Sequence, residues 1–171
     1  VAVAGTGSIT VGKDSCGKIF RCGGWGHLLS DDGSSFFIVK RAMEEILHHL
    51  DGTADCPFLT KEFAARTGLS TQHELAMYFY SHIEEKREIA KFAPIVDASA
   101  RAGEPAAIRI LDEAAQRLWQ SIQTVARRIS PSESFPLNVQ LWGSVFLNSS
   151  YIHDQVTANI CQAYPSASVS Y

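Results

Sequence analysis

The sequence has few of the features that would place the protein outside the cell or in a membrane. Its four cysteines, Cys16, Cys22, Cys56 and Cys161, form no C-x-x-C pair, and their spacing does not resemble a secreted disulfide framework. No apolar run approaches the roughly 20 residues that cross a bilayer, and no charged segment precedes a signal-like apolar core. We therefore expect free thiols in a reducing cytoplasm and no membrane partner.

Charge is also scarce and nearly balanced. Only 19% of the residues are charged, and the formal net charge is -3. This balance gives no general attraction to nucleic acid, so a nucleic-acid partner is not expected. With 171 residues, 46% of them hydrophobic, the chain can form one globular domain with a sizeable core and needs no metal or disulfide to hold it.

Several common catalytic motifs are missing. The chain has no G-x-x-x-x-G-K-S/T loop, no H-E-x-x-H pair and no G-x-S-x-G elbow. These absences argue against a P-loop nucleotidase, a zinc protease and an α/β-hydrolase. The histidines show no metal-ligand spacing, and His48 with His49 at a helix end is typical of a structural position, where a cation suits the helix dipole.

Short apolar runs between glycine-rich turns predict β-strands near both ends of the chain. The expected strands cover residues 1–4, 9–11, 18–21, 137–142 and 166–171, the last as an edge strand. The turn at 5–8 joins the first two strands as a β-hairpin. The sequence opens within an apparent strand at Val1 and without Met, which we interpret as the sign of a piece of a longer protein.

Apolar residues at helical spacing predict a helical middle. A first helix begins after the Asp-Asp-Gly-Ser-Ser segment 31–35 and stops at Gly52. Further helices are expected at 59–66, 71–82, 89–101, 104–128 and 153–163. Pro105 suits the first turn of the longest helix, and Ser130-Pro131 ends it. Strands at both ends around helices predict an α/β domain in which one sheet gathers the strands.

Three segments could bind a ligand. The first is the Gly-Thr-Gly-Ser turn at 5–8, whose glycines let the backbone approach a phosphate and whose hydroxyls can donate to it. A plain hairpin turn explains the same residues. The third is the Gly143-Ser144 turn between a strand end and a helix, where ligands gather in open α/β sheets. A simple connection between strand and helix is the alternative there.

The second segment is Gly24-Trp25-Gly26-His27 with Asp31 and Asp32 behind it. A tryptophan between glycines can present its ring to a ligand, and a nearby carboxylate can accept two sugar hydroxyls. A core tryptophan followed by a helix-capping aspartate fits equally well. The charged segment 84–88, which contains Lys86 and Arg87, is typical of a solvated helix end.

Together and in this order, the three segments resemble N-acetylglucosamine kinases and the wider BadF/BadG ATPase-like group of the actin/Hsp70/hexokinase type. The resemblance rests on VAGTGS at 3–8, CGGWGHLLSDDGS at 22–34, FA at 92–93, the long helix after Gly103, and LWGSV at 141–145. It covers most of the chain and implies a ribonuclease-H-like lobe with a mixed sheet flanked by helices. The whole chain, 1–171, would be the C-terminal lobe of a two-lobe sugar kinase.

The resemblance also implies roles for single residues. Thr6 would contact the ATP phosphates, and Ala93 and Gly143 would flank the adenosine. The amino-sugar pocket would be formed by Ser8, Ile9, Gly24, Trp25, Gly26 and Asp31. Ile9 stands where the family has a polar residue, so any contact from this position would come from its backbone.

The implied reaction is ATP-dependent phosphorylation of N-acetylglucosamine or glucosamine to the 6-phosphate, with Mg²⁺ as a further cofactor. The aspartate that acts as general base in such kinases would lie in the missing N-terminal lobe, so the chain alone would be inactive. A homodimer is a further expectation. Two alternatives remain: an ATPase of the same superfamily that drives a partner protein, and a non-catalytic actin-like binding module.

Overall fold

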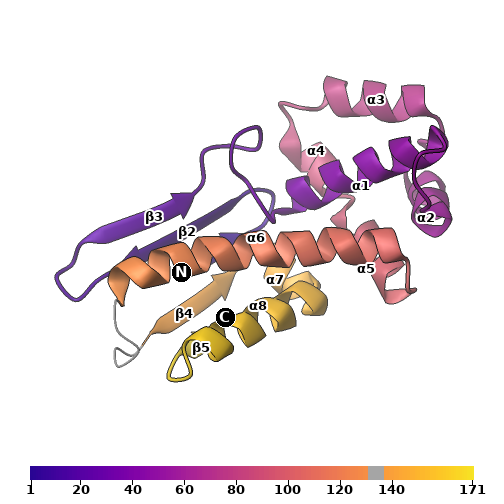
Figure 1. Ribbon diagram of the computed structural model, residues 1–171. Coiled ribbons are helices and arrows are strands. Elements are labelled where there is room, and N and C mark those ends of the chain that lie inside the picture. Colours follow the sequence, from indigo (N-terminus) through magenta and orange to yellow (C-terminus); the bar gives the residue numbers. More distant parts are fainter. Residues whose placement is uncertain (131–136) are drawn as a thin grey trace.

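A mixed five-stranded sheet forms one part of the molecule and a group of helices the other (Figure 1). The computed structural model describes residues 1–130 and 137–171. The strands are β1 (Ala2–Ala4), β2 (Ser8–Lys13), β3 (Ile19–Gly23), β4 (Asn138–Trp142) and β5 (Ser168–Ser170). The helices are α1 (Ser35–Leu50), α2 (Pro57–Thr67), α3 (Gln72–Ser81), α4 (Lys86–Ala90), α5 (Ala93–Arg101), α6 (Pro105–Ile129), α7 (Ser144–Asn148) and α8 (Ser150–Ala163).

The strand order is β3-β2-β1-β4-β5, so the two ends of the chain contribute to a single sheet, as predicted. β1, β2 and β3 pair antiparallel, and Ala2 lies opposite Thr10. β4 runs parallel to β1, with Ala2 opposite Leu141, and β5 extends the parallel part as the edge strand. Because β1 and β4 are parallel, both end at the same edge of the sheet.

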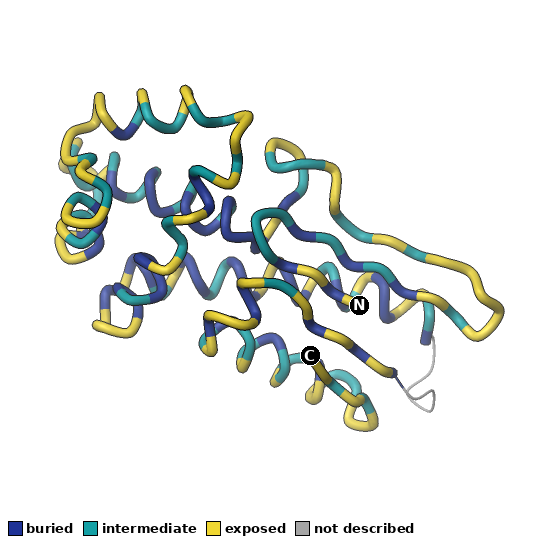
Figure 2. The backbone as a smooth tube through the Cα atoms, turned by 180° about the vertical axis from the view of Figure 1, so that it is seen from behind, coloured by how far each residue is buried: buried dark blue, intermediate teal, exposed yellow. Residues whose placement is uncertain are grey.

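Among the described residues, helices cover one face of this sheet. α6 and α8 pack against each other in front of the strands in Figure 1, and the view from behind in Figure 2 shows the strands uncovered. Ala4 and Leu141 point toward the helices and are buried. Val3 and Trp142 alternate with them and are 39% and 53% exposed on the other face.

The long helix α6 organises the core. Five members of its predicted apolar stripe, Leu111, Ala115, Leu118, Ile122 and Val125, are buried. The two outermost members, Ile108 and Ile129, are half-buried. Pro105 occupies its first turn, as the sequence indicates, and Ser130 follows its last residue. Pro131, which the sequence analysis names with Ser130 as the end of this helix, lies outside the described residues. In the part of the chain that the structure describes, no helix is both long and apolar enough to cross a bilayer.

The helix predicted at 89–101 is wrong in one respect, because the chain forms two helices there. α4 ends at Ala90 and α5 begins at Ala93. Pro94 has no backbone N–H to donate to the carbonyl of Ala90, and its ring clashes with a carbonyl in that position of a continuous helix. A tight turn at Lys91 and Phe92 therefore separates the two helices and changes their direction.

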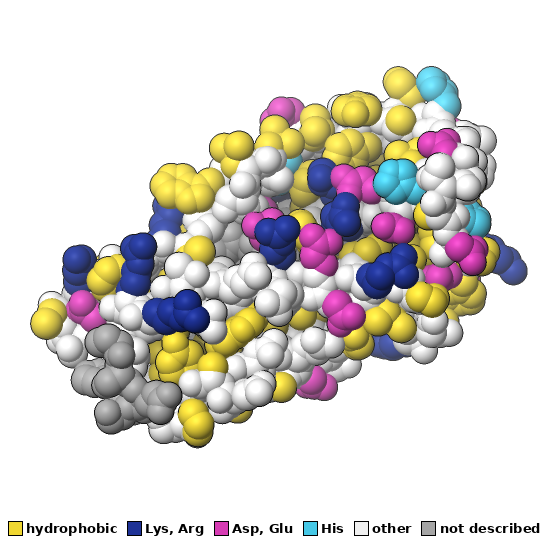
Figure 3. Space-filling view, in the orientation of Figure 1, with side chains coloured by type: hydrophobic (Ala, Val, Ile, Leu, Met, Phe, Trp, Pro, Cys, Tyr) yellow, Lys and Arg dark blue, Asp and Glu magenta, His cyan; other side chains and the backbone are white. Residues whose placement is uncertain are grey.

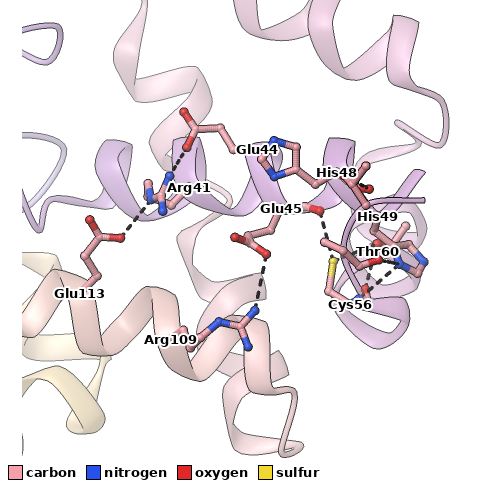
Figure 4. A network of polar contacts seen from close by, with 11 residues as sticks. Arg41, Glu44, Glu45, His48, His49, Cys56, Thr60, Arg109 and Glu113 are labelled. Carbon is pink, nitrogen blue, oxygen red and sulfur yellow. Dashed lines mark hydrogen bonds and ion pairs between the residues drawn. The ribbon is translucent and has the colours of Figure 1, made fainter. Parts of the chain in front are cut away.

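Polar contacts join the helical middle to α6 (Figure 4). Arg41 on α1 donates to Glu113 on α6 at 3.0 Å, and Arg109 on α6 lies 3.6 Å from Glu45 on α1. His49, in the last turn of α1 as predicted, accepts a hydrogen bond from the backbone N–H of Cys56 at 3.2 Å. On the face shown in Figure 3, side chains of both charge signs are interspersed.

Candidate functional site

Two of the predicted ligand-binding turns meet at the edge where β1 and β4 end. A Cβ atom at Gly143 would lie 2.2 Å from the carbonyl oxygen of Ala4, so only glycine fits there. Its φ of 105° is also a conformation that favours glycine. On the other side of this contact, a Cβ at Gly5 would lie 3.7 Å from Oγ of Ser144. The fold therefore brings together two turns that are far apart in the sequence.

The start of α1 lies at the same place. The backbone N–H of Ser35 donates to the carbonyl of Gly5 at 2.8 Å. Ser34 caps the helix by accepting from the N–H of Phe37 at 3.2 Å. The positive end of the helix dipole thus reaches the Gly-Thr-Gly-Ser turn, where Thr6 is half-buried. A glycine turn beside a helix N-terminus is well suited to bind an anion.

A cavity of about 350 Å³ adjoins the turn at Gly143 and Ser144. Its walls come from the start of α1, from α4 and α5 and from α7, and include Ser35, Ile38, Ala93, Pro94, Ser144 and Val145. This volume lies in the range of small-molecule sites in proteins. Ala93, which the resemblance predicts to flank a nucleotide, therefore lines the same cavity as Ser144, the residue after Gly143.

The cavity also contains a buried carboxylate that sequence reasoning missed. Asp97 on α5 accepts a hydrogen bond from Oγ of Ser149 at 2.6 Å and forms an ion pair with Arg101. Asp97 is 8% exposed and stands among the buried residues of its helix. A charged residue within an apolar stripe is the signal that could have indicated it, because a buried carboxylate needs such partners.

Asp31 lies on the other side of the first turn. Its side chain is buried, and a Cβ at Gly7 would lie 2.6 Å from its Oδ2 atom. The same oxygen accepts from Nζ of Lys86 at 3.1 Å. Segment 84–88 is largely exposed, as predicted for a solvated helix end, but the Lys86 side chain also bridges from α4 to the glycine turn. Such a contact over 55 positions has no signal in a single sequence.

The glycine-rich loop at 23–26 is more open. Trp25 is 66% exposed, and the Arg21 guanidinium stacks on its ring at 3.6 Å. Gly24 packs against Ile9, since a Cβ at Gly24 would lie 2.7 Å from that side chain. Around a Cβ built at Gly26, no described residue other than its chain neighbours lies within 4 Å. The structure therefore joins Ile9 to this loop and gives Trp25 a cationic neighbour that the sequence did not indicate.

Ser8 and Ile9 point to opposite faces of the sheet. The Ser8 hydroxyl donates to the backbone carbonyl of Asp32 at 2.7 Å, on the side that faces α6. The Ile9 side chain lies on the uncovered side, beside Gly24. Neither Asp31 nor Asp32 caps α1, because Ser34 does so. Asp31 is thus free of the capping role that the sequence allowed for it.

Two known kinases are similar in sequence to this chain over nearly its whole length. It is 28% identical over 169 residues to the N-acetylmuramic acid/N-acetylglucosamine kinase of Clostridium acetobutylicum, covering 99% of this chain and 55% of the relative. It is 27% identical over 172 residues to the N-acetyl-D-glucosamine kinase of Dictyostelium discoideum, covering 99% of this chain and 53% of the relative. The chain thus spans about half the length of these relatives.

Solved structures share its fold. A candidate N-acetylglucosamine kinase of Chromobacterium violaceum superimposes with a TM-score of 0.75 at 23% identity, over 98% of this chain and 53% of that one. A second one, from Porphyromonas gingivalis, gives a TM-score of 0.70 at 19% identity, over 99% and 54%. At such identities the similarity shows the fold, and it confirms the predicted mixed sheet flanked by helices.

The sequence profile of the BadF/BadG/BcrA/BcrD ATPase family matches residues 1–170. This match includes both glycine turns, the loop with Trp25 and the helical middle. The chain belongs to the BadF/BadG/BcrA/BcrD ATPase family.

Proposed function

We propose that this chain is one lobe of an ATP-dependent kinase that phosphorylates an amino sugar, N-acetylglucosamine or glucosamine, at the 6-hydroxyl. One observation carries the proposal: the two glycine turns and the N-terminus of α1 meet at one sheet edge, beside a cavity of about 350 Å³. The ATPase family supports a nucleotide as the ligand. The relatives named as amino-sugar kinases support the acceptor.

The ATP would lie across the two turns. Its phosphates would bind at the Gly5–Gly7 turn, where the Thr6 hydroxyl and the dipole of α1 favour negative charge. The adenosine would occupy the cavity between Ala93 and the turn at Gly143. Asp97 adds an acceptor to that cavity, held in place by Ser149 and Arg101.

The sugar would bind beyond the first turn, near the loop with Trp25. Asp31 would accept hydrogen bonds from sugar hydroxyls, while Gly24, Trp25 and Gly26 would line the pocket. Ile9, whose side chain packs on Gly24, would contribute through its backbone. Ser8 would approach the sugar with the lone pairs of its hydroxyl, because its proton is donated to the carbonyl of Asp32.

In the proposed reaction, the sugar 6-hydroxyl oxygen forms a bond to the γ-phosphorus of ATP while the bond from that phosphorus to the ADP oxygen breaks. The hydroxyl proton passes to a general base, which we expect to be an aspartate in an N-terminal lobe outside this chain. The chain's own contribution is to position both substrates and stabilise charge on the phosphates. The coverage of about half of each relative is consistent with such a division into lobes.

Mg²⁺ would accompany the nucleotide. This ion keeps several waters and usually binds through one or two carboxylates together with the substrate phosphates. Among the described residues, no group of three or more carboxylate, histidine or cysteine side chains could hold such an ion. The residues described here thus fit a metal that arrives with ATP better than one held by a cage of side chains, and the ion would neutralise phosphate charge.

A coupled ADP-release assay tests the proposal, with the full-length gene product and the 171-residue chain each given N-acetylglucosamine, glucosamine or no sugar. We expect the full-length protein to release ADP in a sugar-dependent manner and the 171-residue chain to release none. ADP release that ignores the sugar would instead indicate an ATPase that drives a partner protein. If calorimetry detects binding of neither ATP nor any hexosamine to the full-length protein, the proposal is wrong and a binding module is favoured.

The same preparation tests two further parts of the proposal. A lobe that depends on the rest of the protein should bind ATP more weakly when expressed as residues 1–171. Sedimentation of the full-length protein would test the proposed homodimer. Cys16 and Cys161 are exposed free thiols, which fits the proposed cytoplasmic location.

A further inference from the structure

Lys86 occupies a position that neither its sequence surroundings nor the proposed reaction explains. It is the first residue of α4, yet its side chain leaves the helical middle and ends beside the Gly-Thr-Gly-Ser turn. Its Nζ atom lies 3.1 Å from Oδ2 of Asp31 and 3.1 Å from where a Cβ of Gly7 would stand. The Gly7 position must therefore lack a side chain for the carboxylate and the ammonium group to lie over the turn.

The two charged groups differ in their exposure. The Asp31 side chain is 5% exposed, whereas that of Lys86 is 39% exposed. A buried carboxylate without a partner is costly, and the ammonium of Lys86 is the partner that the structure gives to Asp31. The contact thus differs from the other lysine ion pairs in the described part of the chain, in which both side chains are at least 33% exposed.

The contact also determines which part of Asp31 remains available. A carboxylate has two oxygens with about four acceptor sites, and Lys86 contacts Oδ2. The backbone of Asp31 is fixed as well, because its carbonyl accepts from the N–H of Ser34 at 3.2 Å. Lys86 and the backbone contact thus hold Asp31 at two points, and neither of them uses the Oδ1 atom.

We propose that Lys86 is a positioning residue for Asp31: it anchors the Oδ2 atom so that Oδ1 and the remaining lone pairs accept hydroxyls of the sugar. This inference rests on the proposed function and deepens it at the sugar site. It also makes sugar affinity depend on α4, because α4 carries Lys86 and packs against α1.

The experiment is calorimetric titration of the full-length protein with N-acetylglucosamine, and separately with a non-hydrolysable ATP analogue. We expect Lys86→Met to weaken sugar binding at least roughly tenfold, which corresponds to about 1.4 kcal/mol, and to leave binding of the ATP analogue within about threefold. Lys86→Arg, which keeps a cation of similar reach, should restore most of the sugar affinity. Lys40→Met is the matched control, since it removes an ion pair on the exposed side of α1.

A double-mutant cycle shows whether Lys86 acts through Asp31. If it does, Lys86→Met should have little further effect on sugar affinity once Asp31→Asn is present, because neighbouring residues that act as one unit are not additive. A merely structural role would instead lower the thermal midpoint and weaken both ligands together. Thermal unfolding of each variant accompanies the titrations.

Three outcomes would overturn the inference. Equal sugar affinity for Lys86→Met and the wild type would remove the positioning role and leave the kinase proposal intact. Weakened binding of the ATP analogue with unchanged sugar affinity would make Lys86 a phosphate ligand instead. Failure of the wild-type protein to bind any hexosamine would overturn the proposed function, and this inference with it.

Discussion

Gly143 lies in direct contact with the backbone of Ala4, the last residue of β1. A Cβ at position 143 would lie 2.2 Å from the Ala4 carbonyl oxygen and 3.1 Å from its nitrogen. The parallel pairing of β1 with β4 produces this contact, since both strands end at one edge and their following turns lie side by side. The two turns proposed to contact the nucleotide can therefore lie this close together only because residue 143 is a glycine.

The first prediction concerns this contact. Gly143→Ala should destabilise the fold by at least about 2 kcal/mol, because overpacking and a strained positive φ each cost about 1–3 kcal/mol. The two turns must also move apart, so we expect affinity for an ATP analogue to fall. Urea denaturation and calorimetry measure the two effects.

Gly103→Ala is the control for that substitution. Gly103 also has a positive φ, 89°, but apart from its chain neighbours no described residue lies within 4 Å of a Cβ built there. It should lose about 1 kcal/mol from backbone strain and bind the analogue normally. Similar losses for both variants would show that the contact with Ala4 contributes little.

The second prediction concerns the cavity. Ala93→Leu adds a larger side chain to the wall of the 350 Å³ space and should weaken binding of an ATP analogue roughly tenfold or more. Because Ala93 is only half-buried, the free energy of unfolding should change little. Ala76→Leu, at a half-buried position of α3, is the control. Unchanged nucleotide affinity in Ala93→Leu would place the adenosine elsewhere.

Strand and helix positions followed from local patterns. The apolar stripe of α6, its Pro105 start and the strand β4 depend on residues close in sequence, and these were predicted from local patterns. The capping box of α3, in which Thr71 accepts from Glu74 N–H and Glu74 accepts in return, also has a local signal. Pro94 carried such a signal too, yet apolar periodicity across it led to one predicted helix instead of two.

The candidate site depended on contacts that no local pattern contains. Gly5, Thr6 and Gly143 were predicted from their turns, but their meeting depends on the parallel register of β1 and β4. The bridging role of Lys86 was missed for the same reason, since its partner Asp31 lies 55 positions away. Asp97 had a local signal as a charged residue within an apolar stripe, but its partner Ser149 lies 52 positions away. Sequence reasoning thus indicated the candidate ligand-binding turns, and the tertiary structure was needed to find the charges around them.

The third prediction uses pH. Burial alone would raise the pKa of the Glu44 carboxyl, but hydrogen bonds from Lys40 and Arg41 outweigh it and lower the pKa below 4.5. A carboxyl with a lowered pKa contributes stability above its unfolded pKa and loses it as the pH falls through the folded value. The stability difference between wild type and Glu44→Gln should therefore shrink as the pH falls below about 4.5.

The difference in the free energy of unfolding between wild type and Glu44→Gln should be small. The pairs are partly exposed, with 33% exposure for Glu44 and 36% for Arg41, so we expect less than about 1 kcal/mol at pH 7. Urea midpoints between pH 7 and pH 3 provide the measurement. A difference that stays constant over this range would show that Glu44 acts through packing and not through its charge.

The fourth prediction concerns Trp25. The chain has three tryptophans, and Trp25 is the most exposed at 66%, against 53% for Trp142 and 8% for Trp119. If the sugar binds at the loop, the indole of Trp25 loses water and its contact with Arg21 changes, which should shift the emission of the full-length protein on addition of N-acetylglucosamine.

Two variants assign that signal. Trp25→Phe should abolish the emission change and weaken sugar binding, while Trp142→Phe, on the uncovered face of the sheet, should keep the change. Arg21→Ala should alter the starting emission because it removes the cation at 3.6 Å from the ring. An emission change that survives in Trp25→Phe and disappears in Trp142→Phe would move the sugar away from the loop, toward the sheet face where Trp142 and Val3 lie exposed.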